Sequence, residues 1–206
     1  MRFLRSYRKI SRPIRKHKPR KSLLEPLEQR QLLAVTANAG GPYSGNEGTA
    51  IQLSAAGSSG DITEYAWDLN DDGVYDDGSG VTVNFNPGDN GSFDVGLQVT
   101  GPSGTDTDEV TVSIVNVAPT LSVVASNTDV VRGENVKFIL TMVDQSPADA
   151  AAGFLYEFDW GDGSGYSDSQ TGNSGAERNY RFWDLGSVDV RIRATDKDSG
   201  VSNEVT

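Results

Sequence analysis

A nine-residue pattern occurs twice in this chain, and the repeat constrains the fold more than any other feature. Residues 65–73 read YAWDLNDDG and residues 156–164 read YEFDWGDGS, so alternating aromatic side chains run into aspartates and an Asp-Gly pair in both copies. Side chains on a β-strand alternate between two faces, so the aromatic positions of each copy share one face. We expect that face to be buried, whereas the Asp-Gly pair is typical of a tight turn.

The two copies extend beyond this pattern. Tyr65 and Tyr156 are 91 residues apart, while Glu109 and Glu204 are 95 apart, which indicates a four-residue insertion between the two pairs. From residue 35 onward, short β-type runs alternate with Gly, Asn and Asp, and no stretch of ten or more residues has helical periodicity. The pattern predicts an all-β chain of two tandem immunoglobulin-like antiparallel β-sandwiches, residues 35–118 and 119–206.

The second sandwich is expected to lack most of its last strand. Glu109 aligns with Glu204, and the first copy continues through residues 112–117, VSIVNV, for which the second copy has no counterpart in this sequence. Alternation would place about two of the four apolar side chains of that segment in the core. The second sandwich is therefore predicted to be the less stable one.

Charge divides the chain into two parts. Residues 1–34 hold 11 Lys and Arg against two Glu, a balance of +9, whereas residues 35–206 hold 7 basic and 27 acidic residues, a balance of −20. The acidic part would repel phosphates, which argues against nucleic acid as a partner. The basic leader is typical of a targeting segment and is expected to be disordered or a short helix. No segment has the roughly 20 apolar residues of a membrane span.

Composition also excludes common catalytic and metal chemistry. The chain has no cysteine, and its one histidine, His17, lies in the basic leader. Histidine-dependent triads and the usual zinc sites are therefore not expected in residues 35–206. The sequence has no nucleophile elbow, zinc-protease helix or phosphate loop, so we predict no catalytic residues and no enzyme activity.

Two resemblances add a biological setting. Residues 24–34, LEPLEQRQLLA, resemble the N-terminal sorting motif LExLExRxLLA of large surface and secreted proteins of planctomycete type. This resemblance implies a secreted or cell-surface protein whose mature part starts near Ala34.

Residues 35–206 resemble tandem PKD domains, sandwiches of the polycystic kidney disease type whose third-strand motif has the form YxWDFGDG. The first copy departs from it at Leu69-Asn70, and the second has Phe158 where the family favours tryptophan. The resemblance implies a non-catalytic spacer and adhesion module. Its partners would be other domains of the same longer chain and an extracellular protein or polysaccharide. The alternatives are an accessory region of a secreted hydrolase whose catalytic domain lies outside this chain, and a calcium-rigidified structural rod.

The acidic turn of the first copy is the candidate metal site. The residues that match positions 1, 3, 5 and 9 of a calcium loop are Asp68, Asn70, Asp72 and Asp76. Gly73 matches position 6, but Ser79 replaces the bidentate glutamate at position 12, and Asp77 is a possible substitute ligand.

The competing interpretation of these turns is structural. Aspartate side chains can accept hydrogen bonds from the backbone of their own turn and need no ion to do so. In that case Trp67 and Phe158 anchor the two turns to the cores, and the second copy, which keeps only Asp159 and Asp162, behaves in the same way. Calcium is the one possible cofactor.

Overall fold

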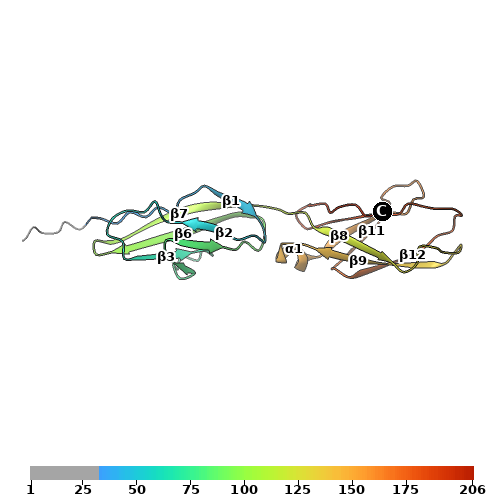
Figure 1. Ribbon diagram of the computed structural model, residues 1–206, viewed down its shortest axis with the longest axis horizontal. Helices are drawn as coiled ribbons and strands as arrows, with labels where there is room; N and C mark the ends of the chain where they lie inside the picture. Colours follow the sequence, from blue (N-terminus) through green and yellow to red (C-terminus); the bar gives the residue numbers. More distant parts are fainter. Residues whose placement is uncertain (1–32) are drawn as a thin grey trace, which may run out of the picture. The chain divides into compact units, whose positions relative to one another are not determined.

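The computed structural model describes residues 33–206, and these residues belong to one compact unit. The predictions for the leader, its short helix and the sorting motif at 24–34 lie outside the described residues, apart from the last two positions of the motif. The described part is nearly all β (Figure 1). It contains no helix long and apolar enough to span a membrane.

The first sandwich is built from two sheets. A five-stranded sheet has the order β1-β7-β6-β3-β4, and a two-stranded sheet pairs β2 with β5. β1 runs parallel to β7, while the remaining pairs are antiparallel. The strands are β1 (Tyr43–Asn46), β2 (Ile51–Ser54), β3 (Glu64–Asp68), β4 (Gly78–Ser79), β5 (Thr82–Phe85), β6 (Gly91–Gly101) and β7 (Gly104–Val115).

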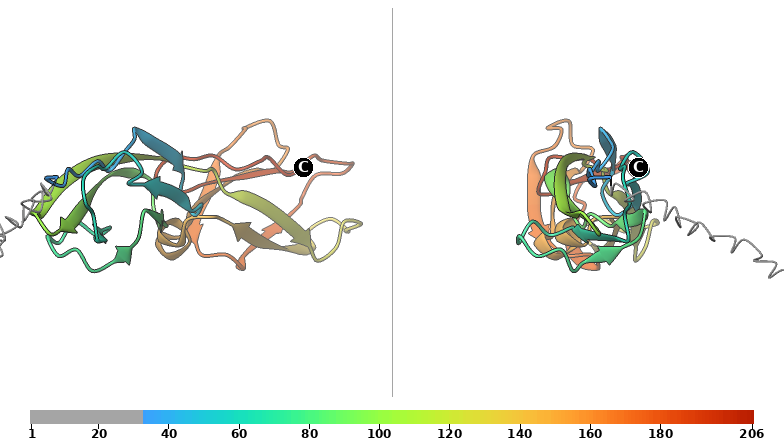
Figure 2. Two further views of the ribbon diagram at one scale, coloured as in Figure 1. Left: turned by 60° about the vertical axis from the view of Figure 1, so that its left-hand side comes forward. Right: turned by 90° about the vertical axis from the view of Figure 1, so that its left-hand side faces the viewer.

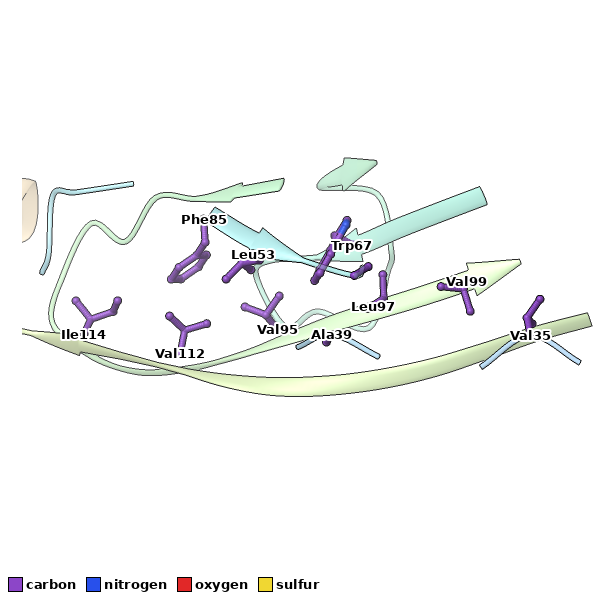
Figure 3. Packing of buried hydrophobic residues seen from close by; sticks show 11 residues of the cluster. Val35, Ala39, Leu53, Trp67, Phe85, Val95, Leu97, Val99, Val112 and Ile114 are labelled. Carbon is purple, nitrogen blue, oxygen red and sulfur yellow. The ribbon is translucent and has the colours of Figure 1, made fainter. Parts of the chain in front are cut away.

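The first core lies between these two sheets. Every second residue in the middle of β6 is buried, as its strand periodicity requires, and Figure 3 shows these side chains together with those of β2, β5 and β7. Trp67 of β3 has no exposed surface, and its indole Nε1 donates a hydrogen bond to the carbonyl of Gly80 over 3.0 Å. The prediction that Trp67 anchors the first copy to its core is confirmed.

The second sandwich has two three-stranded sheets and one short helix. The sheets have the orders β11-β10-β13 and β12-β9-β8. The elements are β8 (Thr120–Ala125), β9 (Asn135–Val143), α1 (Pro147–Ala152), β10 (Phe154–Asp159), β11 (Asp168–Gly172), β12 (Ala176–Arg181) and β13 (Arg191–Thr195).

A second, separate core is centred on β10. Tyr156 and Phe158 have no exposed surface, and Trp160 is nearly buried. The Trp160 ring is stacked between two others, with its centroid 5.1 Å from that of Phe158 and 3.9 Å from that of Tyr180. Phe158 therefore occupies the buried place that Trp67 has in the first core, and this prediction is confirmed too.

Some strands differ from what the alternation of side chains indicates. Residues 187–195, SVDVRIRAT, alternate apolar and polar side chains throughout, but β13 begins only at Arg191. β1, β4 and β11 have no alternating apolar pattern, since their sequences are YSGN, GS and DSQTG. The hydrogen bonds of a neighbouring strand hold them in place.

The segment after β13 contains no regular strand among the described residues. Val201 and Val205 form isolated antiparallel bridges to Thr195 and Ile192. In the first sandwich, the corresponding partner of β6 is the long strand β7, paired with it from Gly91 to Gly101.

The helix α1 lies at the contact between the two sandwiches (Figures 1 and 2). Ser146 caps its N-terminus by accepting from the Asp149 amide, and Pro147 occupies the first turn. The Ser146 hydroxyl also donates to the Gly88 carbonyl of the first sandwich over 3.0 Å. The helix therefore connects a loop of the first sandwich to the second.

Candidate functional site

The acidic loop that follows β3 is closed by hydrogen bonds to its own backbone. Asp68 is only 4% exposed, and its Oδ2 accepts from the Gly73 amide over 2.8 Å. Its Oδ1 accepts from the Asp72 amide over 3.3 Å. Asp71 and Gly73 have φ of 57° and 83°, a left-handed conformation that aspartate tolerates and glycine adopts freely. These bonds turn the chain back sharply after the strand.

The other oxygens of the loop have similar partners. Asn70 Oδ1 accepts from the Asp72 amide over 3.0 Å, and Asp72 Oδ1 accepts from the Val74 amide over 2.8 Å. Asp77 Oδ2 accepts from two backbone amides on the opposite side of the loop, those of Leu69 and Asn70. Asp76 is exposed at the surface. The loop is thus a hydrogen-bonded turn in which most of the possible calcium ligands already accept hydrogen bonds from backbone amides.

The structure does not bring the predicted ligands together as a compact group of carboxylates. Two groups of three acidic side chains in residues 33–206 have oxygens within 4.8 Å of one another, and neither includes Asp68, Asp72 or Asp76. Calcium binding by the loop stays a prediction.

The second copy of the turn uses an arginine. Asp159 accepts from the Gly161 amide over 3.0 Å and forms an ion pair with Arg191. The Gly161 amide, followed by the Arg191 guanidinium, lowers the pKa of Asp159. Hydrogen bonds from the Ser164 hydroxyl and amide lower the pKa of Asp162. Both carboxylates are therefore stabilised in their ionised form by groups of the same sandwich.

A different acidic group lies where the two sandwiches meet, and sequence reasoning missed it. It consists of Glu47, Asp144 and Asp149, which we call the junction triad, and their oxygens lie within 4.8 Å of one another. Glu47 follows β1 of the first sandwich, whereas Asp144 follows β9 of the second and Asp149 lies in α1. Glu47 and Asp149 are fully buried.

Hydrogen bonds with backbone amides hold the three members of the junction triad in place. Glu47 Oε1 accepts from the Val117 amide of the linker over 2.7 Å, and Asp144 Oδ1 accepts from the Ser146 amide over 2.8 Å. The backbone of Asp149 is fixed by the helix cap at Ser146, over 3.2 Å. The linker thus holds Glu47, while hydrogen bonds within the single segment 144–149 hold Asp144 and Asp149.

Lys197 provides positive charge beside the triad. Its Nζ lies 3.1 Å from Asp149 Oδ1, without the alignment of a hydrogen bond, and 2.7 Å from Asp89 Oδ1 of the first sandwich. It also pairs with Asp198. Hydrogen bonds to Asp198 and then Asp89 raise the pKa of Lys197, so the side chain stays charged.

Burial has the largest effect on the pKa of Asp149 and raises it. The Lys197 ammonium lowers this pKa, but the neighbouring Glu47 and Asp144 charges raise it further. One lysine therefore does not compensate the negative charge gathered at Asp149.

A cleft of about 570 Å³ opens in the second sandwich. Its lining includes the ring of Tyr180 and the exposed side chains of Trp183 and Leu185, which are 58% and 86% exposed. By contrast, the side chains of Tyr43 and Tyr166 have partners within their own sandwich. Tyr43 donates to the Ala39 carbonyl over 2.9 Å, and Tyr166 bonds to Glu204 beneath two arginines.

Comparison with known proteins gives a family for the first sandwich. Residues 33–114 match the family model of the PKD domain. No match was found among curated proteins. The match therefore covers the first sandwich and ends before the linker.

Several solved structures are similar at low identity. The PKD domain of an M14-like peptidase from a Thermoplasmatales archaeon is 19% identical, with 44% of this chain and 91% of that chain covered and a TM-score of 0.35. The IgVJ-C2 molecule of amphioxus is 13% identical over 79% of this chain and 97% of that one, with a TM-score of 0.43. The D00-D0 domain of intimin is 15% identical over 84% and 98%, with a TM-score of 0.32.

Proposed function

We propose that this chain is a non-catalytic spacer and adhesion module of a secreted or cell-surface protein. The match of the first sandwich to the PKD family supports this role. The state of Asp159 supports it as well, because the Gly161 amide and the Arg191 guanidinium lower its pKa. A carboxylate held ionised in this way is a poor proton donor for acid-base catalysis.

The observation that carries the proposal is the set of contacts that fasten the two sandwiches together. Glu47 Oε1 binds the linker amide of Val117, the Ser146 hydroxyl binds the Gly88 carbonyl, and Lys197 pairs with Asp89. A spacer must hold its neighbours at a defined separation, and a short linker alone leaves domains free to reorient. These contacts favour a fixed arrangement.

The adhesion part of the proposal involves other domains of a longer chain and an extracellular protein or polysaccharide. Exposed aromatic and apolar side chains such as Trp183 and Leu185 favour contacts of this kind, because aromatic rings provide both apolar area and a flat stacking surface. The alternative role, an accessory region of a secreted hydrolase, has no separate support in residues 33–206.

Pulsed electron paramagnetic resonance measures the property that the spacer role needs. The chain has no cysteine, so Thr107→Cys in β7 and Thr141→Cys in β9 provide one exposed spin-label site in each sandwich. We expect a single narrow distance distribution for the full chain. In a matched Glu47→Ala variant, which loses the linker hydrogen bond, the distribution should broaden. A broad distribution in the unmodified background would overturn the proposal.

A further inference from the structure

The junction triad contains buried carboxylate oxygens that accept no hydrogen bond. Glu47 Oε2, Asp144 Oδ2 and both side-chain oxygens of Asp149 are buried and have no hydrogen-bond partner among the described residues. An ionised carboxylate has no proton to donate, so these oxygens cannot satisfy one another. Buried polar groups in folded proteins nearly always have partners, and unpaired buried charges are especially unfavourable.

The arrangement also concentrates negative charge. Glu47 and Asp149 are 0% exposed and each has an unpartnered oxygen. One oxygen from each of these residues and one from Asp144 lie within 4.8 Å of one another. Among the described residues, Lys197 is the one basic side chain within 4.0 Å of this group, and it touches only Asp149 Oδ1. Two further carboxylates, Asp89 and Asp198, share that ammonium. The charge of Lys197 is thus divided among three acids.

We propose that Glu47, Asp144 and Asp149 bind one calcium ion at the junction of the two sandwiches. The ion accepts electron pairs from the oxygens that lack donors and offsets the charge that Lys197 leaves uncompensated. This site is distinct from the Asp68–Asp76 loop, whose oxygens accept backbone hydrogen bonds.

The ligand chemistry favours calcium over other cations. All three side chains offer carboxylate oxygens, which hard divalent cations prefer, while zinc and the later transition metals favour the nitrogen and sulfur ligands that this group lacks. Calcium accepts six to eight oxygens in irregular geometry, with carboxylates binding through one or both oxygens. Magnesium requires a near-ideal octahedron, which three side chains from two different sandwiches are less suited to form.

Binding at this position would join the sandwiches. Glu47 belongs to the first sandwich, and Asp144 and Asp149 belong to the second, so one ion bridges the two. Glu47 Oε1 additionally bonds the linker amide of Val117, so the ion and the linker act on the same side chain. The site does not depend on the spacer role, because a junction could bind calcium in a protein of any function.

Titration calorimetry and thermal melting of the full chain test the proposal. Calcium chloride should bind with one site and a Kd of about 10⁻³ M or tighter, the range of extracellular modules and stronger sites. About 10 mM calcium should raise the melting temperature by about 3–10 °C over the value in EDTA, because an ion that binds only the folded state stabilises it. Magnesium should bind at least about tenfold more weakly.

Isosteric variants assign the ligands. Glu47→Gln and Asp149→Asn keep the size of each side chain, and in each we expect at least about a tenfold loss of calcium affinity. In EDTA both variants should melt at or above the native temperature, since they remove buried charge. Asp72→Asn in the loop after β3 is the matched control and should bind calcium normally. The proposal is overturned if calcium does not bind, if magnesium binds equally well, or if Asp72→Asn rather than the triad variants loses binding. Melting of the triad variants well below native in EDTA would also overturn it, since the carboxylates would then act structurally without an ion.

Discussion

The loop after β3 and the junction triad are both acidic, but their oxygens have opposite surroundings. Asp68 accepts from two backbone amides of its own turn, whereas Asp149 is buried with neither side-chain oxygen hydrogen-bonded among the described residues. The loop carboxylates lie within one ten-residue stretch, 68–77, and most of them accept from its backbone amides. The triad carboxylates come from two distant segments, with Glu47 in one and Asp144 and Asp149 in the other. A dense acidic motif can thus be a turn, while scattered acids form the group that needs a cation.

If the loop is a structural turn, its stability should depend on the core beneath it. Trp67→Ala should lower the free energy of unfolding by about 3–5 kcal/mol, because truncating a large buried aromatic leaves a cavity. The loss would also remove the hydrogen bond from Trp67 Nε1 to the Gly80 carbonyl on the far side of the loop. Chemical denaturation measures this change, and a cost under about 1 kcal/mol would show that Trp67 does not anchor the turn.

The hydrogen bonds within the loop should contribute less, and unequally. Asp68→Ala removes the acceptor of two backbone amides and should cost about 1–3 kcal/mol in EDTA. Asp76→Ala, at an exposed position, should cost less than about 0.5 kcal/mol. Denaturant melts of the two variants side by side provide the comparison. Equal costs, or a larger cost for Asp76→Ala, would mean that the loop is not held by Asp68.

The elements that could be predicted from the sequence are those whose side chains alternate strongly. β3 and β10 have aromatic residues on one face, so Trp67 and Phe158 could be identified as core positions. β1 and β11 could not be predicted because their sequences carry no such alternation. Tyr43–Asn46 is a strand because it pairs in parallel with β7, a long-range contact that local pattern does not encode.

The candidate site was less predictable than the fold. The motif search found Asp68, Asn70, Asp72 and Asp76 because calcium loops place their ligands at regular spacing in one segment. Glu47 and Asp144 are separated by nearly half of the chain, and only the packing of the two sandwiches brings them together. The sequence carries one weak sign of this group. Asp149 is the one charged residue of the short, otherwise small-residue segment PADAAA, which forms α1.

Nuclear magnetic resonance with calcium titration tests the difference between the two acidic groups most directly. Amide protons report on the carboxylates to which they donate, and the two groups have distinct reporters. The amides of Val117 and Ser146 donate to the triad, while the amide of Gly73 donates to Asp68. We predict saturable shifts of the Val117 and Ser146 resonances as calcium is added, with the Gly73 resonance unchanged. Saturable shifts at Gly73, with Val117 and Ser146 unaffected, would contradict the account and return the calcium site to the loop after β3.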